Sequence, residues 1–136
     1  MRLRSVELAL PQAQAAAEFL LEPWRLIAAG MQGGAQFFRG TGPHPYILSI
    51  REAAAPAVLA IEFSGSPEEV AALQARTRAA GVPVETFAEL DAPGGGAGCI
   101  VTGPEKQKYR FVAEAEPVAE LPPERDRPLQ ITHAVL

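Results

Sequence analysis

Few residues of this chain have the types and spacing that catalysis or metal binding requires. The chain contains two histidines, His44 and His133, and one cysteine, Cys99. His44 lies between two prolines, which predicts a solvated turn residue, with a site for a phenolic substrate as the minor alternative. Cys99 falls in an apolar run with no second cysteine to pair with, so we expect a buried side chain that behaves as a small apolar group. A lone histidine such as His133 is more often a plain strand residue than a metal ligand, so its surroundings must decide.

The acidic residues and the glycine run give no clear catalytic motif. Glu62, Glu85 and Glu114 fall in predicted strands, but 16 acidic residues in 136 make chance proximity common, and we expect solvated strand faces. The run 94–96 of three glycines precedes a strand and has no Gly-Lys-Ser/Thr ending. It therefore predicts a flexible hairpin and not a phosphate-binding loop.

Length, composition and charge describe one globular domain. The chain has 136 residues, 48% of them hydrophobic, and a net charge of −4 with its basic residues scattered. Nucleic-acid binding needs a concentrated basic surface, so we exclude nucleic acid as a partner. The apolar runs are all shorter than the roughly 18 residues that span a bilayer, so we expect no membrane partner. A single cysteine suits a reducing compartment, and we expect a cytoplasmic protein.

The first half of the chain predicts a strand, a helix and three further strands. Alternating apolar residues predict a strand over Leu3–Leu10. The Ala-rich segment that follows predicts a helix with Pro11 at its first position, extending to about Leu21 and ended by Pro23. Glycine-containing turns then separate three short predicted strands, at 24–29, 35–39 and 46–51.

The second half repeats this order. Residues 58–63 predict a strand, and Ser66, Pro67 and Glu69 predict a helix start with a capping box, ended at Gly81. Three more strands are predicted at 82–90, 98–102 and 108–114. The repeat predicts an α+β fold in which two tandem βαβββ modules form a cupped mixed/antiparallel sheet with helices on the outer face. Each module can bury its sheet face only against the other.

The repeat also divides the chain into segments. The paired βαβββ domain covers 1–116, with module one at 1–53 and module two at 56–116. Residues 117–128 are rich in proline and charge, which predicts an extended linker. Residues 129–136 have a strand pattern with no hairpin partner, and we expect them to be the first strand of a following module.

A tandem βαβββ duplication resembles the vicinal-oxygen-chelate superfamily, which includes glyoxalase I, bleomycin-resistance proteins and extradiol dioxygenases. Residues 39–43 followed by 46–52 look like the third-to-fourth-strand hairpin of two-domain extradiol dioxygenases. Residues 91–98 look like the glycine-rich turn of their second module, and 127–136 look like the crossing into their catalytic domain. Over its whole length the chain resembles the N-terminal domain of such a ring-cleavage enzyme.

The resemblance implies a metal site between paired modules, formed by two histidines and one carboxylate. Such a triad holds Fe(II) and leaves positions open for a catecholate and O₂. Transferred to this sequence, the three ligand positions fall on Ser5, Leu59 and Arg110. Serine is a poor ligand and leucine is none, and an arginine 4 Å from a divalent ion costs about 8 kcal/mol at an effective dielectric of 20. We therefore expect no metal, cofactor or catalytic residue in this domain, with Fe(II) confined to the full-length enzyme.

His133 stands where the first metal ligand of a following domain would stand. It would bind a metal only together with that domain or with a partner chain. Arg110 could instead bind an anionic ligand in the cup, although an exposed arginine or one paired with a glutamate is the more ordinary interpretation.

Three functions remain open from the sequence. The first is a structural, oligomerising N-terminal domain of an Fe(II)-dependent extradiol dioxygenase for a catechol-type aromatic, inactive alone and packed on a catalytic C-terminal domain. The second is a metal-free small-molecule-binding protein of the bleomycin-resistance type. The third is a homodimeric glyoxalase-like lyase or isomerase, in which a second copy exchanges its last strand so that His133 enters a shared site. In the second, a small aromatic ligand would lie between the aromatic side chains Trp24, Phe37, Phe38, Tyr46 and Phe111.

Overall fold

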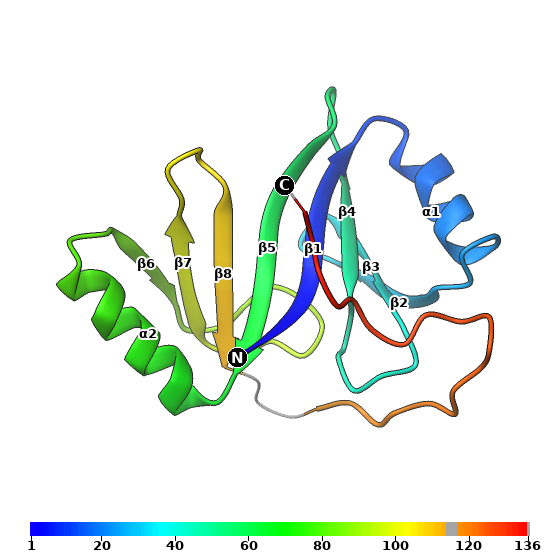
Figure 1. The fold of residues 1–136 in the computed structure, drawn as a ribbon. Coiled ribbons are helices and arrows are strands. Elements are labelled where there is room, and N and C mark those ends of the chain that lie inside the picture. Colours follow the sequence, from blue (N-terminus) through cyan, green and yellow to red (C-terminus); the bar gives the residue numbers. More distant parts are fainter. Residues whose placement is uncertain (114–116, 136) are drawn as a thin grey trace.

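The strand–helix–strand repeat is present in the computed structural model of the chain, which describes residues 1–113 and 117–135 (Figure 1). The elements are β1 Arg2–Leu10, α1 Ala13–Leu21, β2 Ile27–Gln32, β3 Ala35–Arg39, β4 Leu48–Glu52, β5 Ala57–Gly65, α2 Pro67–Ala79, β6 Val84–Phe87, β7 Gly98–Thr102 and β8 Lys108–Ala113.

The strands form one mixed sheet of eight strands in the order β2-β3-β4-β1-β5-β8-β7-β6. The two modules meet at the antiparallel pair β1–β5. Each module repeats the same pairing, because β1 is parallel to β4 and β5 is parallel to β8 while the outer strands are antiparallel. The sheet is not closed into a barrel. The α+β prediction of two tandem βαβββ modules is therefore confirmed.

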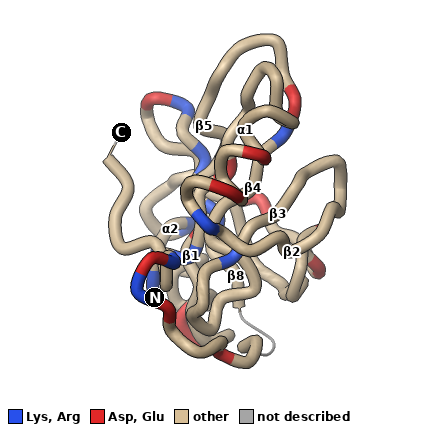
Figure 2. Tube along the Cα trace, turned by 90° about the vertical axis from the view of Figure 1, so that its right-hand side faces the viewer, with Lys and Arg blue, Asp and Glu red and all other residues tan. Residues whose placement is uncertain are grey.

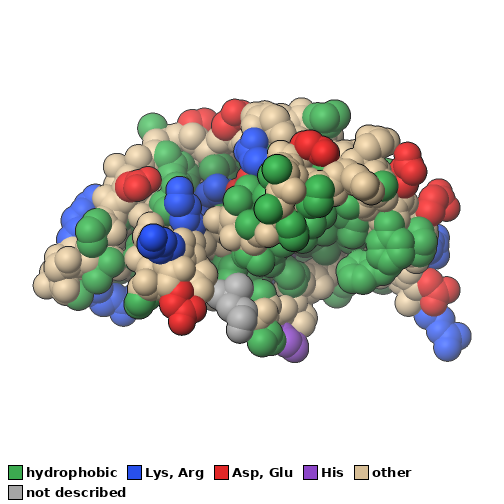
Figure 3. Space-filling view, turned by 90° about the horizontal axis from the view of Figure 1, so that it is seen from above, with side chains coloured by type: hydrophobic (Ala, Val, Ile, Leu, Met, Phe, Trp, Pro, Cys, Tyr) green, Lys and Arg blue, Asp and Glu red, His purple; other side chains and the backbone are tan. Residues whose placement is uncertain are grey.

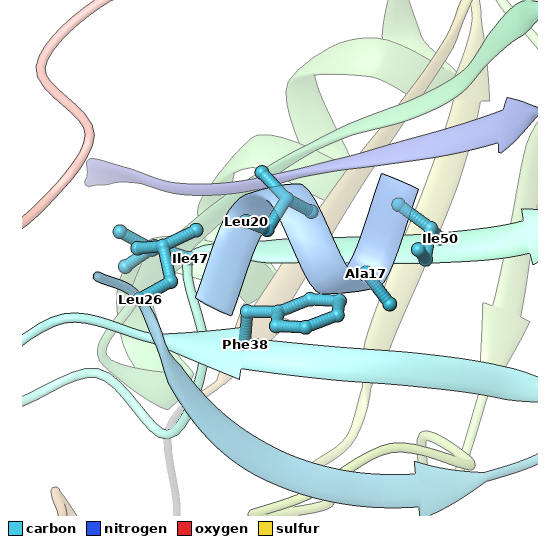
Figure 4. Close-up of a cluster of buried hydrophobic side chains, with 6 residues drawn as sticks. All are labelled: Ala17, Leu20, Leu26, Phe38, Ile47 and Ile50. Carbon is cyan, nitrogen blue, oxygen red and sulfur yellow. The ribbon is translucent and has the colours of Figure 1, made fainter. Parts of the chain in front are cut away.

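The two faces of the sheet are occupied differently. Figure 1 shows α1 to the right of the central β1–β5 pair and α2 to its left, each beside the strands of its own module. Beneath α1, Ala17 and Leu20 of the helix pack on Phe38 and Ile50 of the sheet (Figure 4). A second apolar cluster, which includes Phe37, forms on the opposite face. Side chains alternate between the faces of a strand, so adjacent residues such as Phe37 and Phe38 serve different clusters.

The start of α2 agrees with the sequence prediction. The Ser66 side chain accepts a hydrogen bond from the Glu69 amide at 3.2 Å, and the Glu69 carboxylate accepts one from the Ser66 amide at 2.9 Å. Pro67 is the first helical residue, and Gly81 beyond the helix has φ +75°. The capping box and the left-handed stop are thus confirmed, because both depend on residues close in sequence.

The start of α1 differs from the prediction. Pro11 is not the first helical residue, since α1 begins at Ala13 and Gln12 takes a left-handed conformation with φ +57°. The Glu52 carboxylate, at the end of β4, accepts hydrogen bonds from the amides of Gln12 at 3.0 Å and Ala13 at 2.7 Å. A side chain 39 residues away in sequence therefore satisfies the first amides of this helix.

Several strands have other bounds than expected. The segments expected at 3–10, 24–29, 46–51, 58–63 and 82–90 form the strands 2–10, 27–32, 48–52, 57–65 and 84–87. The backbone of residues 24–26 is used in the turn that follows α1, where the Leu26 amide donates to the Leu20 carbonyl at 2.9 Å. Glu114, the expected end of the last strand, lies outside the described residues.

Residues 117–135 follow the surface without regular secondary structure. The strand expected at 129–136 is not formed over residues 129–135. The Leu129 carbonyl instead accepts a hydrogen bond from the Gly42 amide, which lies in a loop. Leu136 lies outside the described residues. The division into 1–116, 117–128 and 129–136, with a following module, stays a prediction. No helix in the described part of the chain is long and apolar enough to cross a membrane.

Candidate functional site

A β-bulge in β1 gathers polar side chains on the face of the sheet opposite the helices. Leu3 pairs with Phe63 and Ser5 pairs with Glu62, so Arg4 is the extra residue in this strand. A bulge of this kind turns two consecutive side chains toward one partner. Accordingly the Arg4 Nε lies 2.8 Å from Glu62 Oε1, and the Ser5 hydroxyl donates to the same oxygen at 3.1 Å.

Glu62 is the centre of this polar group, although it is only 1% exposed. On its other side β8 places Arg110 in register with it, and the Arg110 Nη1 donates to Glu62 Oε2 at 2.9 Å. The Tyr46 hydroxyl donates to Glu62 Oε1 at 2.8 Å and accepts from Arg4 Nη2 at 2.9 Å. The Arg4 guanidinium also lies 4.7 Å from the centre of the Tyr46 ring, within cation–π range. The Glu62 carboxylate, on β5, is thus engaged by four side chains, which come from β1, β8 and the loop before β4.

Glu7 extends the network toward module one. It accepts from Arg110 Nη2 at 3.1 Å and from Arg51 Nε at 2.5 Å. The sequence of pairs Arg51–Glu7–Arg110–Glu62–Arg4 therefore runs across β4, β1, β5 and β8, and we refer to these five residues as the ion-pair chain. Figure 2 shows basic and acidic positions interleaved along the backbone, without a patch of one charge. Each carboxylate of the chain lies between two guanidinium groups.

The protonation states in this network are set by burial and by neighbouring charges. Burial lowers the pKa of the Arg110 guanidinium, but the carboxylates of Glu62 and Glu7 outweigh it, and the net pKa is raised above its ordinary value. Burial, followed by the Glu62 charge, raises the pKa of the Tyr46 phenol well above its usual range. Arg110 is therefore a permanent cation, and Tyr46 remains a neutral donor to Glu62.

The face of the sheet opposite the helices, which we call the cup, is largely covered beside the ion-pair chain by the loop 88–97 of module two. Ala92 is buried in the cluster with Ala35, Phe37 and Tyr46, and Gln32 Nε2 donates to Asp91 Oδ1 at 3.0 Å. The remaining hollow has a volume of about 170 Å³. It is lined by Glu7, Phe37, Ser49, Arg51, Leu90, Asp91, Ala92 and Arg110. Ligand pockets usually measure about 300–1,000 Å³, so this space suits only a very small molecule.

The structure joins two of the three expected ligand positions and separates the third. Ser5 and Arg110 both contact Glu62, and the expectation that Arg110 pairs with a glutamate is confirmed. Leu59 does not join them, because a second irregularity, between the pairs Glu7–Ala60 and Leu8–Val58, makes it an extra residue of β5. Glu62 is the residue in register with both. The expectation that Glu62 lies on a solvated strand face is wrong, and an acidic residue inside the apolar run 57–63 was the available signal.

The other candidate residues have varied positions. His133 is exposed, and the described residues contain no group of three or more His, Cys, Asp or Glu side chains arranged to hold a metal.

His44 is only 6% exposed, so the expectation that it is a solvated turn residue is wrong. The Val118 amide donates to the adjacent Pro43 carbonyl, which places the segment after 117 over this turn. Cys99 is fully buried in β7, as expected, and burial raises the pKa of its thiol. Glu85 is exposed on β6, as expected, and Glu114 lies outside the described residues.

The five aromatic residues expected to form the walls of the cup are not gathered there. Phe37 and Tyr46 meet edge-to-face at 4.7 Å on the cup side. Phe38 packs beneath α1, and Phe111 stacks on Phe63 at 5.4 Å on the opposite face of the sheet from Arg110. Trp24 is exposed and lies 5.9 Å from the Phe19 ring. Figure 3 shows hydrophobic side chains gathered toward the side of the molecule on which Figure 1 places α1. An aromatic cup is therefore a wrong expectation, because alternation sends neighbouring residues to opposite faces.

Solved structures of known proteins share this arrangement of strands. The Mn(II)-bound glyoxalase from Novosphingobium aromaticivorans matches 91% of the chain with a TM-score of 0.82 and 24% identity. Homoprotocatechuate 2,3-dioxygenase from Arthrobacter globiformis matches 89% with a TM-score of 0.79 and 24% identity. The enzyme from Brevibacterium fuscum, in complex with 3,4-dihydroxyphenylacetate, matches 89% with a TM-score of 0.79 and 20% identity.

These likenesses concern the fold and only part of each known protein. No family model and no curated protein matches the sequence. The chain spans 42% of the glyoxalase and 38% and 39% of the two dioxygenases. Identities below 25% establish common architecture and no shared activity. The chain therefore has the same paired βαβββ fold, a vicinal-oxygen-chelate fold, as the glyoxalase and the two dioxygenases, and it spans about two fifths of each of these three proteins.

Proposed function

We propose that this chain is a non-metal-binding, structural N-terminal domain of an Fe(II)-dependent extradiol dioxygenase, inactive alone. The observation that carries the proposal is the engagement of Glu62 by Arg4, Ser5, Tyr46 and Arg110 at the meeting of the two modules. A carboxylate that could serve as a metal ligand is used instead to neutralise the buried Arg4 and the partly buried Arg110. The paired βαβββ fold is present, and ion pairs occupy its centre.

The residues at this centre do not fit a divalent metal. Glu7 and Glu62 are the acidic side chains of the ion-pair chain, and each already contacts two guanidinium groups. A metal bound by Glu62 would displace its partners and leave the buried Arg4 without compensation, which costs several kcal/mol. It would also lie within a few ångströms of Arg110, whose positive charge repels it. No reaction step is therefore assigned to a metal in this domain.

The partial coverage of the similar structures supports a second, catalytic domain. Two of these proteins are homoprotocatechuate 2,3-dioxygenases and one is a Mn(II)-bound glyoxalase, and this chain spans about two fifths of each. One dioxygenase binds 3,4-dihydroxyphenylacetate, so a catechol-type aromatic is the substrate class we propose for the whole enzyme. In that enzyme the iron would be held by the other domain, and His133 would contribute only from its position beside that domain. A reduced Cys99 fits the cytoplasmic location we propose.

The test uses the purified chain with Fe(II) in air and 3,4-dihydroxyphenylacetate as substrate. We expect no ring-cleavage product above that formed by Fe(II) in buffer, measured by absorbance, and no saturable change of Trp24 fluorescence with the catechol. Turnover by the chain would overturn the proposal. Saturable binding without turnover would replace it with the metal-free binding protein. The small hollow beside Phe37, about 170 Å³, is the reason to expect neither.

A further inference from the structure

The segment 117–131, which we call the strap, is bound to module one and is not a free linker. We propose that the strap is a releasable arm: a backbone lock made possible by Gly40 and Gly42 holds it on module one, and it detaches without unfolding the paired sheet. This inference does not depend on the proposed function. The lock determines the direction in which the residues after 131 leave module one.

The lock consists of hydrogen bonds on both edges of the loop 40–43. On one edge the amides of Thr41 and Gly42 donate to the carbonyls of Pro128 and Leu129, both at 3.0 Å. On the other edge the Leu121 amide donates to the Thr41 carbonyl at 2.8 Å, and Val118 donates to the Pro43 carbonyl at 3.1 Å. The loop is therefore hydrogen-bonded to two arms of the strap, 118–121 and 128–129.

The two glycines make room for this close approach. A Cβ at Gly40 would lie 2.4 Å from the Leu129 carbonyl oxygen and 2.5 Å from that of Pro128, and a Cβ at Gly42 would lie 2.8 Å from the Leu129 oxygen. Neither glycine has a positive φ, so other residues could adopt the same backbone conformation. The nearest obstructing atoms belong to the strap and not to the sheet. A methyl group at either position therefore excludes the strap specifically.

The other contacts of the strap are few. Ile131 packs against the core cluster beneath α1, and two arginines hydrogen-bond to backbone carbonyls: Arg39 Nη2 to Ala119 at 3.1 Å and Arg127 Nη1 to Arg25 at 2.9 Å. Glu124 pairs with Arg25 at 2.8 Å and with Arg127 at 3.3 Å, but its side chain is 49% exposed, and exposed pairs of this kind contribute little. A groove of about 190 Å³ remains open between the strap and module one, next to Ile131 and Trp24. The Thr41 hydroxyl beneath the strap is buried without a hydrogen-bond partner among the described residues. Release would return this hydroxyl to water, which lowers the cost of opening.

Release would change two features of the molecule. It would uncover the apolar groove of Leu26, Ile47 and Leu48 beside Trp24, and it would free the direction of the chain that follows residue 131. His133 lies two residues beyond the strap, so its position relative to module one depends on the lock. Elements that open independently of the core are characteristically held by few apolar contacts.

Hydrogen exchange of the full chain tests this directly. In the wild type we expect the amides of Thr41 and Leu121 to be protected, and to open together at lower urea than the amides of β1 and β5. In Gly40→Ala and Gly42→Ala we expect these two amides to lose protection by at least about tenfold, the Trp24 emission to shift to longer wavelength, and β1 and β5 to keep their protection. Gly103→Ala is the control, because its Cβ would meet only the movable Tyr109 ring and residues of its own hairpin. Gly103→Ala should leave the protection of the Thr41 and Leu121 amides as in the wild type.

Three results would overturn the proposal. The amides of Thr41 and Leu121 could be unprotected in the wild type, or they could stay protected in both alanine variants. They could also open only together with the amides of β1 and β5 as urea rises, which would make the strap an inseparable part of the core. The wild-type urea series decides between release and joint unfolding even if a glycine variant does not fold.

Discussion

Glu62 shows how one residue determines the character of the site. Its carboxylate is buried between Arg4 and Arg110 and receives two hydroxyl donors besides. Burying charges is costly, and a buried pair that replaces packed apolar groups is seldom a source of net stability. Breaking the pair by removing one partner is much worse, because the remaining charge loses compensation. The network is therefore sensitive to the loss of any single member.

Glu62→Gln should lower the free energy of unfolding by about 3–5 kcal/mol, because Arg4 and Arg110 would then share too little negative charge. Urea denaturation measures this change. The matched control is Glu124→Gln, since Glu124 also contacts two arginines but is half exposed. The control should cost less than about 1 kcal/mol. Equal effects of the two changes would show that burial of the network contributes nothing.

Tyr46 predicts a dependence of stability on alkaline pH. Its pKa is raised by burial and by Glu62, so the folded chain keeps the phenolic proton at a pH where the unfolded chain has lost it. Above the ordinary phenol pKa of about 10, the unfolded state binds fewer protons, and stability falls as pH rises by up to about 1.4 kcal/mol per pH unit. Urea denaturation between pH 9 and 11, compared with Tyr46→Phe, measures this slope. An unchanged slope in Tyr46→Phe would contradict the assignment.

The sequence identified part of this site. The resemblance singles out the positions of Ser5 and Arg110. It could not identify Glu62 as their common partner, because that depends on the bulge at Arg4 and on strand register, which are properties of the folded sheet. The place of Leu59 as an extra residue of β5 likewise depends on the register of the folded sheet.

At the scale of elements, the two helices begin by different means. Helix α2 is capped by residues within its own first turn, Ser66 and Glu69, and the sequence predicts its start. Helix α1 is capped by Glu52 from β4, with Gln12 in a left-handed conformation. Local sequence signals cannot report a cap that comes from a strand formed 39 residues later. The expected start at Pro11 was wrong for this reason.

Glu52→Ala should destabilise the chain by about 1–2 kcal/mol, because two amides at the start of α1 lose a charged acceptor. Thermal or urea unfolding gives the value, and exchange of the Ala13 amide should accelerate. Glu85→Ala on the exposed face of β6 is the control and should change stability by less than about 0.5 kcal/mol. If both variants unfold alike, Glu52 does not cap α1.

At the scale of the whole molecule, the duplication is what the sequence predicts best. The order of one strand, one helix and three strands, repeated, is enough to expect the paired sheet, because each module needs the other to cover its face. The segment after residue 116 was less predictable. Its proline and charge content suggests a free linker, yet the strap pairs with the loop 40–43 along both edges. Backbone pairing of this kind leaves only the two glycines as a trace in the sequence.

Metal stoichiometry tests the central claim, that ion pairs and not a metal ion occupy the centre of this paired βαβββ domain. The purified chain would be incubated anaerobically with Fe(II) and, separately, with Mn(II), desalted and analysed for metal. The ion-pair chain predicts retention far below one ion per chain, equal in the wild type and in Glu62→Gln. Retention of about one ion per chain, lost in Glu62→Gln and kept in Glu124→Gln, would contradict the account and make Glu62 a metal ligand.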